Sequence, residues 1–294
     1  MKRIIPLILA ALLLCACGAP PETETPTFPP LAEATPVQQT QQATAAPVET
    51  DAPQQDGSFW TKLDPAAAMQ ADLDGDGTAE TVTVTVNEDA YTTDVTVEGA
   101  AGTLTDHLDT ALMFLKAYYG DAKAGDGSRE LYLTGDEASD DYATYAYRIV
   151  NGALQRTDIF GEAVDCDGET VTIRRATDVL GTYDSTCKYA LQDGEFRFRP
   201  VSPFTIARYE GDWADRVLTL QKDGLPVQTT AGETTLQKGT ELMLTETDQE
   251  SYAVLVDRQG NAYRISMEKP ADDWRWFIGG VAEGDWFGEL LYAG

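Results

Sequence analysis

Apolar and polar residues alternate along much of this chain, as is typical of short β-strands. Residues 80–86 read ETVTVTV and residues 171–175 read VTIRR. Apolar side chains occupy every second position from Val82 to Val86 and again at Val171 and Ile173. A period of two predicts half-buried strands. Turn pairs such as Asn151-Gly152 separate these runs and predict hairpins. The pattern therefore predicts a mainly β fold built from antiparallel units.

One stretch departs from this alternation. Apolar residues recur there at helical spacing: Leu108, Ala111, Leu112, Leu115 and Tyr119. With Thr105 as a cap and Gly120 as a stop, this spacing predicts a short helix near 106–119. Alignment of the repeated segments described below instead makes 112–119 a strand, and both alternatives stay open.

The chain begins with Lys2 and Arg3, followed by an apolar run from Ile4 to Leu14. This run is too short for a membrane-spanning helix and is typical of a secretory signal. Leu14-Cys15-Ala16-Cys17 then resembles the lipobox of bacterial lipoproteins; an ordinary signal peptide is the alternative. The resemblance implies a signal peptide over 1–17 and a lipid on Cys17. The protein would then be anchored to the cell membrane on its extracytoplasmic face.

Residues 18–57 are rich in Pro, Thr, Gln and Ala and contain no Lys or Arg. Such a composition cannot bury enough apolar area to offset the entropy of ordering, which predicts a disordered tether. The remaining chain divides into a β-repeat domain over 58–210 and a small all-β domain over 211–294. The order of short apolar runs in the latter is similar to Src-homology-3-like barrels.

The stretch ADLDGDGTAETVTVTV, residues 71–86, combines an acidic loop with a strand. Oxygen-bearing residues occupy positions 1, 3, 5, 7 and 9 of a calcium loop: Asp72, Asp74, Asp76, Thr78 (through its carbonyl) and Glu80. Hard oxygen ligands at alternate positions converge on calcium, and Gly77 permits the sharp turn. Position 12 is Thr83, inside the predicted strand, which excludes an EF-hand.

The pattern D-x-D-G-D-G-x-x-E running into a strand resembles the loop of FG-GAP and VCBS-type repeats. The resemblance implies a β-turn held by calcium and repeat units arranged like propeller blades. Three antiparallel units follow, over 80–100, 129–160 and 169–200. Because a complete propeller has at least about four blades, we expect a partial one.

A second copy of the loop, GDGSRELYLTG, begins at Gly125. It places Asp126 and Glu130 where the first copy has Asp76 and Glu80. Asp121 is one residue out of register, so this is a weaker second metal site.

Cysteine and histidine limit the chemistry available. Cys166 and Cys187 remain after the signal, and they form either a disulfide or two buried thiols. His107 is the only histidine and has no nucleophile motif near it. Glycine loops that bind nucleotides are absent from the sequence. These observations indicate a protein that is not an enzyme.

The net charge of −28, from 21 Lys and Arg against 49 Asp and Glu, disfavours nucleic acid as a partner. The sequence therefore predicts an anchored, calcium-binding lipoprotein with a non-catalytic binding or scaffold role, whose partner is an envelope glycan or protein. The alternative is an envelope glycoside hydrolase that uses two carboxylates.

Replacing Cys17 with Ala tests the anchor. Without the thiol no lipid can be attached, so we expect the protein to move from the membrane fraction into the medium or to persist as an uncleaved precursor. Fractionation and electrophoretic mobility measure both. Unchanged membrane association and mobility would contradict the lipobox.

Overall fold

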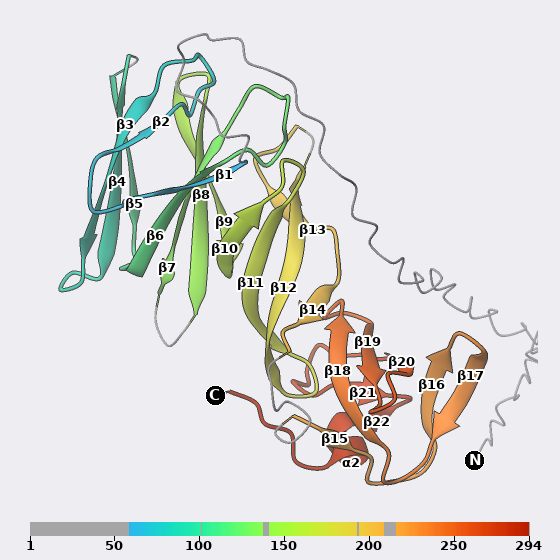
Figure 1. Ribbon diagram of the computed structural model, residues 1–294. Coiled ribbons are helices and arrows are strands. Elements are labelled where there is room, and N and C mark those ends of the chain that lie inside the picture. Colours follow the sequence, from blue (N-terminus) through green and yellow to red (C-terminus); the bar gives the residue numbers. More distant parts are fainter. Residues whose placement is uncertain (1–58, 101, 138–140, 193, 209–215, 294) are drawn as a thin grey trace, which may run out of the picture. The chain divides into compact units, whose positions relative to one another are not determined.

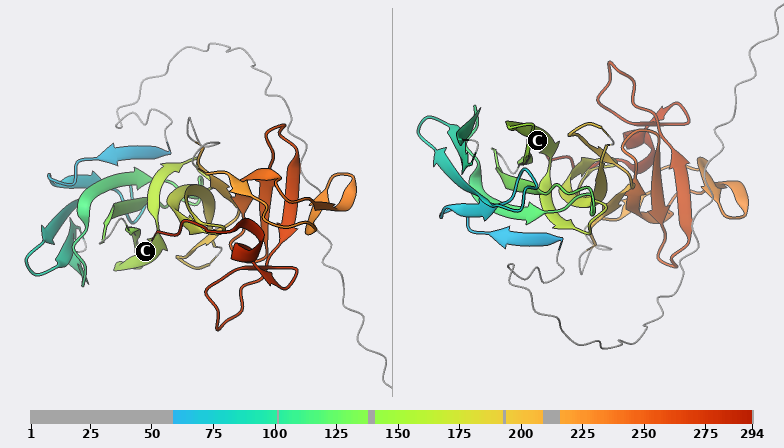
Figure 2. Two further views of the ribbon diagram at one scale, coloured as in Figure 1. Left: turned by 90° about the horizontal axis from the view of Figure 1, so that it is seen from below. Right: turned by 90° about the horizontal axis from the view of Figure 1, so that it is seen from above.

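The computed structural model describes residues 59–100, 102–137, 141–192, 194–208 and 216–293 (Figures 1 and 2). These residues form antiparallel β-sheets and one short helix, which confirms the mainly β prediction. The predicted signal peptide with Cys17 and the predicted tether lie outside the described residues. No described helix is long and apolar enough to cross a membrane.

Three antiparallel sheets follow one another along the first part of the chain. The first sheet consists of β2 (Met69–Ala71), β3 (Glu80–Asn87), β4 (Thr92–Gly99) and β5 (Gly102–Leu108). The second consists of β1 (Trp60–Leu63), β6 (Met113–Gly120), β7 (Glu130–Asp136), β8 (Tyr142–Val150) and β9 (Ala153–Phe160). The third begins with β10 (Glu162–Cys166), β11 (Val171–Asp178) and β12 (Thr182–Leu191), with β13 (Phe198–Pro200) and β14 (Phe204–Ile206) both paired to β12.

Each sheet contains four strands that are consecutive in sequence and pair in order: β2 to β5, β6 to β9, and β10 to β13. The connection between the first and second strand of each set is a loop that contains Gly and Asp, and the first two of these are the loops predicted from the sequence. These loops span 72–79, 121–129 and 167–170. The repeated sequence therefore corresponds to a repeated structural unit.

The second sheet is buried on both faces, because it lies between the other two (Figure 1). One core cluster joins it to the first sheet through, among others, Val82, Val95, Leu131, Leu133 and Tyr147. The other joins it to the third sheet through, among others, Tyr132, Ala146, Ile173, Cys187 and Phe198. Every residue of β7 is accordingly buried. This packing of sheet on sheet places the loops of neighbouring units next to each other.

The last part of the chain continues the third sheet, since β14 pairs with β18. Its elements are β15 (Leu218–Thr219), β16 (Leu225–Thr229), β17 (Gly232–Leu236), β18 (Glu241–Thr247), β19 (Tyr252–Val256), β20 (Ala262–Ser266), β21 (Phe277–Ile278), β22 (Val281–Ala282) and α2 (Glu283–Phe287). Trp276, Trp286 and Phe287 lie in its core, together with Leu180 of the third sheet's β11–β12 turn. No sheet of the described residues closes on itself. The predicted boundary at 210 and 211 falls among residues 209–215, which are not described.

The predicted helix near 106–119 is wrong, and the alternative strand is right. Strand β5 ends at Leu108 and strand β6 begins at Met113. A bulge between Met113 and Lys116 interrupts the alternation of β6. Phe114 there has a φ of 52° and is 75% exposed. A strand end, a turn and a bulge together therefore mimic helical spacing.

The structure decides between the alternatives for Cys166 and Cys187: both are free, buried thiols. Cys166 ends β10 and Cys187 lies on β12, with β11 between them. Strands two positions apart are separated by roughly 9–10 Å, which exceeds the span of a disulfide. The Cys166 thiol donates to the carbonyl of Asp121 at 3.1 Å, and the Cys187 thiol to that of Ser202 at 3.1 Å.

We expect these thiols to react with iodoacetamide only after unfolding. Burial raises the pKa of Cys166 to about 11 and also raises that of Cys187, so neither forms the reactive thiolate near neutral pH. Mass spectrometry of protein alkylated with and without urea measures this. A peptide linking the two cysteines in non-reduced protein would contradict the structure.

Candidate metal centre

Three carboxylates of the first loop come together in a group that could hold a metal ion. The carboxylate oxygens that Asp72, Asp74 and Glu80 offer all lie within 4.8 Å of one another. Oxygens at this spacing can each lie about 2.3–2.6 Å from one shared cation. Glu80 is buried, Asp72 is partly buried and Asp74 is exposed. The group is therefore open to solvent on one side and fixed to the protein on the other.

Backbone N–H groups hold two of these carboxylates in place. The Leu73 N–H donates to Oε2 of Glu80 at 2.7 Å and closes the loop onto the first residue of β3. Asp72 accepts from Gly75 N–H through Oδ1 (2.9 Å) and from Gly77 N–H through Oδ2 (3.0 Å). The two glycines have φ values of 75° and 90°, which other residues rarely adopt.

One predicted carboxylate ligand, that of Asp76, does not belong to this group. Asp76 accepts the Thr78 N–H through Oδ1 at 2.7 Å, as in a turn stabilised by its own Asp side chain. Asp74 makes the same kind of contact, with the Asp76 N–H at 3.1 Å, and still contributes to the group. Three of the four predicted carboxylate ligands thus come together, and the Thr78 carbonyl stays a predicted ligand.

The charge of the group favours a cation. Burial raises the pKa of Glu80 above its usual value, and the nearby charges of Asp74 and Asp72 raise it further. The hydrogen bond from the Leu73 N–H opposes these effects. Carboxylates this close repel one another unless a proton or a cation compensates them.

Contacts from distant residues, which the sequence analysis missed, position the loop. The Tyr119 hydroxyl donates to the Asp72 carbonyl at 2.8 Å, and the Ile149 N–H donates to the Leu73 carbonyl at 2.8 Å. A Cβ atom on Gly75 would lie 2.1 Å from the carbonyl oxygen of Gly127 in the second loop. These partners are far away in sequence, so no local pattern identifies them.

The second loop repeats this architecture with one additional residue. Ala122 N–H donates to Oε2 of Glu130 at 3.2 Å, as Leu73 N–H does to Glu80. The carbonyl of Asp121 accepts from the Cys166 thiol, as that of Asp72 does from Tyr119. Asp121 is therefore the counterpart of Asp72, which accounts for its shift in the sequence alignment.

The predicted second metal site at Asp126 and Glu130 differs from the first. Asp126 accepts the Ser128 N–H at 2.8 Å, and Glu130 accepts the Tyr132 hydroxyl at 3.2 Å. Among the described residues, no third His, Cys, Asp or Glu forms a metal-binding group with them. Glu130 is only 1% exposed, and burial raises its pKa to about 7.

The chain was compared with known proteins. No protein-family model, no curated protein and no solved structure matches it.

Glu130→Gln should remove a pH dependence of stability. Because the folded-state pKa of Glu130 lies above the usual 4.5, its contribution to stability is full below about pH 4.5 and is lost as the pH rises through about 7. Urea unfolding in chelator should show the wild type losing on the order of 2 kcal/mol between pH 5 and pH 8 relative to the variant.

Glu98→Gln, at an exposed position of β4, is the control and should keep the wild-type dependence. An identical pH dependence for Glu130→Gln and the wild type would show that Glu130 titrates normally.

Proposed function

We propose that this protein is a lipid-anchored extracytoplasmic lipoprotein in which calcium stabilises a β-repeat domain that serves a non-catalytic binding or scaffold role. The observation that carries the proposal is the group formed by Asp72, Asp74 and Glu80. It lies in the segment whose sequence resembles the calcium loop of FG-GAP and VCBS-type repeats.

Calcium is the cation that best suits this group. All three side chains offer hard oxygen atoms, and no His or Cys belongs to the group, which disfavours zinc and other soft metals. Calcium takes about six to eight oxygens in flexible geometry, so carbonyls such as that of Thr78 and water complete its shell. Magnesium demands stricter octahedral geometry, which an exposed loop supports poorly.

The arrangement of the sheets supports a partial propeller. Each unit has four consecutive antiparallel strands, and the second unit is buried between the other two. Blades of a propeller pack face to face in this way. In the last part of the chain β18, β19 and β20 pair in sequence and β16 lies beside β20, an order that supports a small barrel-like module. We therefore retain the Src-homology-3-like module as part of the proposal.

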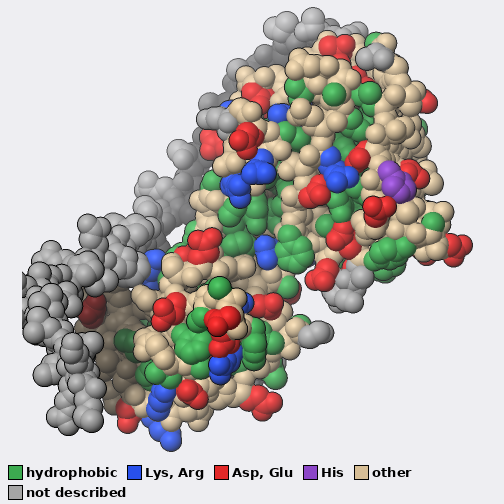
Figure 3. Space-filling view, turned by 180° about the vertical axis from the view of Figure 1, so that it is seen from behind, with side chains coloured by type: hydrophobic (Ala, Val, Ile, Leu, Met, Phe, Trp, Pro, Cys, Tyr) green, Lys and Arg blue, Asp and Glu red, His purple; other side chains and the backbone are tan. Residues whose placement is uncertain are grey.

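The surface charge favours a partner other than nucleic acid. Asp and Glu side chains are spread over much of the face drawn in Figure 3. Together with the net charge of −28, this distribution repels phosphate backbones. An envelope glycan or protein remains the proposed partner, and the lipid on Cys17 is the proposed membrane contact.

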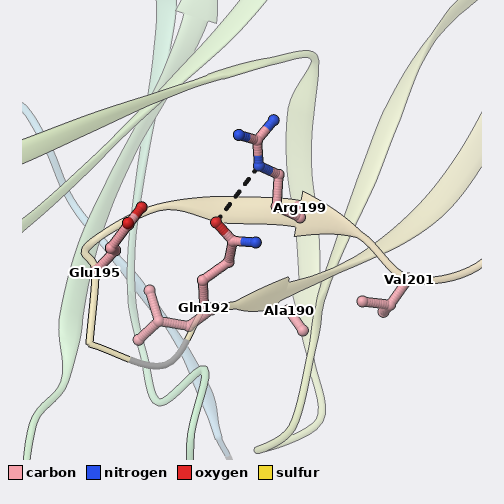
Figure 4. Close-up of a pocket in the computed structure, with 6 residues that line it drawn as sticks. Ala190, Gln192, Glu195, Arg199 and Val201 are labelled. Carbon is pink, nitrogen blue, oxygen red and sulfur yellow. Dashed lines mark hydrogen bonds between the residues drawn. The ribbon is translucent and has the colours of Figure 1, made fainter.

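Among the described residues, the glycoside hydrolase has less support than the binding role. That mechanism uses two carboxylates about 5 to 10 Å apart across a groove. The pocket shown in Figure 4 has one carboxylate, that of Glu195, among its lining residues. His107 bonds to Asp94 at 2.6 Å on the exposed surface of the first sheet.

Calcium should raise the melting temperature of the protein, and Asp74→Asn should abolish the increase. At a hundredfold excess over its dissociation constant, calcium bound only to the folded state adds roughly 2.7 kcal/mol of stability. For a domain of this size the melting temperature then rises by roughly 5 to 10 °C. Calorimetry with calcium or chelator, and with magnesium as a comparison, measures the shift.

Asp89→Asn removes the same charge from the exposed turn between β3 and β4 and is the matched control. It should melt like the wild type in calcium. The calcium site would be overturned if the melting temperature of the wild type did not change with calcium up to roughly ten millimolar. That concentration lies well above the expected dissociation constant.

A further inference from the structure

A pocket lies on the outer face of the hairpin formed by β12 and β13, away from the metal centre's sheet. Its lining residues are Ala190, Leu191, Gln192, Glu195, Arg199 and Val201 (Figure 4). Ala190 and Arg199 are directly opposite each other in the hairpin. Because alanine is short, the position facing the long Arg199 side chain is left open. The resulting hollow has a volume of about 430 Å³, within the range of roughly 300–1,000 Å³ typical of small-molecule pockets.

Arg199 lines this hollow, and its guanidinium makes one hydrogen bond to the other residues drawn in Figure 4. Its Nε makes a long contact of 3.5 Å with Oε1 of Gln192, and Figure 4 shows its two terminal nitrogens directed away from Gln192. Among the described residues Arg199 has no ion pair, although Glu195 lines the same pocket. In a chain with more than twice as many acidic as basic residues, an exposed arginine that lines a pocket and has no ion pair to any described residue is unexpected.

We propose that this pocket binds the carboxylate group of a small ligand through Arg199. A guanidinium presents paired N–H donors that match the two oxygens of a carboxylate. Ala190 and Val201 supply an apolar surface for the carbon atoms next to that group. The Gln192 amide, which already contacts Arg199, offers a further donor to the ligand. This binding site is independent of the calcium loop.

Two sources of such a carboxylate exist outside a cell: the end of a peptide and an acidic sugar. Isothermal titration calorimetry with the full chain compares N-acetylalanine with its amide, and glucuronate with glucose. Within each pair, only the first compound carries a carboxylate. We expect a dissociation constant on the order of 1 mM for at least one carboxylate and no measurable binding of its neutral partner. The pair that shows the difference identifies the source.

Arg199→Gln should weaken this binding by roughly tenfold or more, since a charge-assisted bidentate contact is lost. Arg197→Gln is the matched control. It removes an arginine from the same exposed segment, outside the pocket lining, and should change affinity by less than about threefold. Glu195→Gln should tighten binding, because it removes a like charge from the pocket. Melting temperatures equal to the wild type show that each variant is folded.

Failure of both carboxylates to bind at roughly ten times the expected dissociation constant would overturn the proposal. Equal binding of a carboxylate and its neutral partner would do so as well. An equal loss in Arg197→Gln and Arg199→Gln would also overturn it, because that result indicates general attraction to a basic surface instead of a site.

Discussion

The first two sheets depend on one shared constraint, a buried glutamate at the start of the second strand. Glu80 and Glu130 each accept a backbone N–H from the beginning of the preceding loop, and this bond closes the loop onto the sheet. A buried carboxylate is costly unless its charge is compensated. In the first loop Asp72 and Asp74 accompany the glutamate, so a cation is the natural compensation. In the second loop the Tyr132 hydroxyl donates to Glu130, and burial raises the pKa of Glu130 to about 7, which favours its neutral form below that pH. One architecture thus supports two chemical solutions.

Spacing within the first loop was sufficient to predict its acidic group, because the ligands of a tight turn are close in sequence. Asp72, Asp74 and Glu80 do come together. The same spacing also suggested Asp76, whose carboxylate instead stabilises the turn through the Thr78 N–H. Spacing limits which side chains can converge, but the backbone decides which of them do. The contact of Tyr119 with the Asp72 carbonyl joins residues 47 positions apart and depends on how two sheets pack. Such packing is not encoded in any local pattern.

The error at residues 106–119 has a related cause. Period-based prediction assumes that one regular element spans the window, whereas this window contains the end of β5, a turn, and a bulge in β6. Leu108 and Leu112 are buried because both lie where the two strands meet the core, not because they share a helical face. The repeat alignment predicted the strand correctly, since it compared units instead of spacings. Similarity between units is therefore the more reliable guide in a chain whose fold repeats.

The loops of the three units also contact one another, which links the units mechanically and explains the glycine at position 75. The Gly127 carbonyl occupies the space where a side chain on Gly75 would be, and the Ala124 N–H donates to the Gly168 carbonyl at 2.8 Å. The proposed ion, by fixing the first loop, would therefore limit the movement of the second loop, and the second loop would restrain the third. Glycine is required at Gly75 for two independent reasons, its φ of 75° and this close approach. A single cation near Asp72 can thus stabilise more of the protein than the loop that binds it.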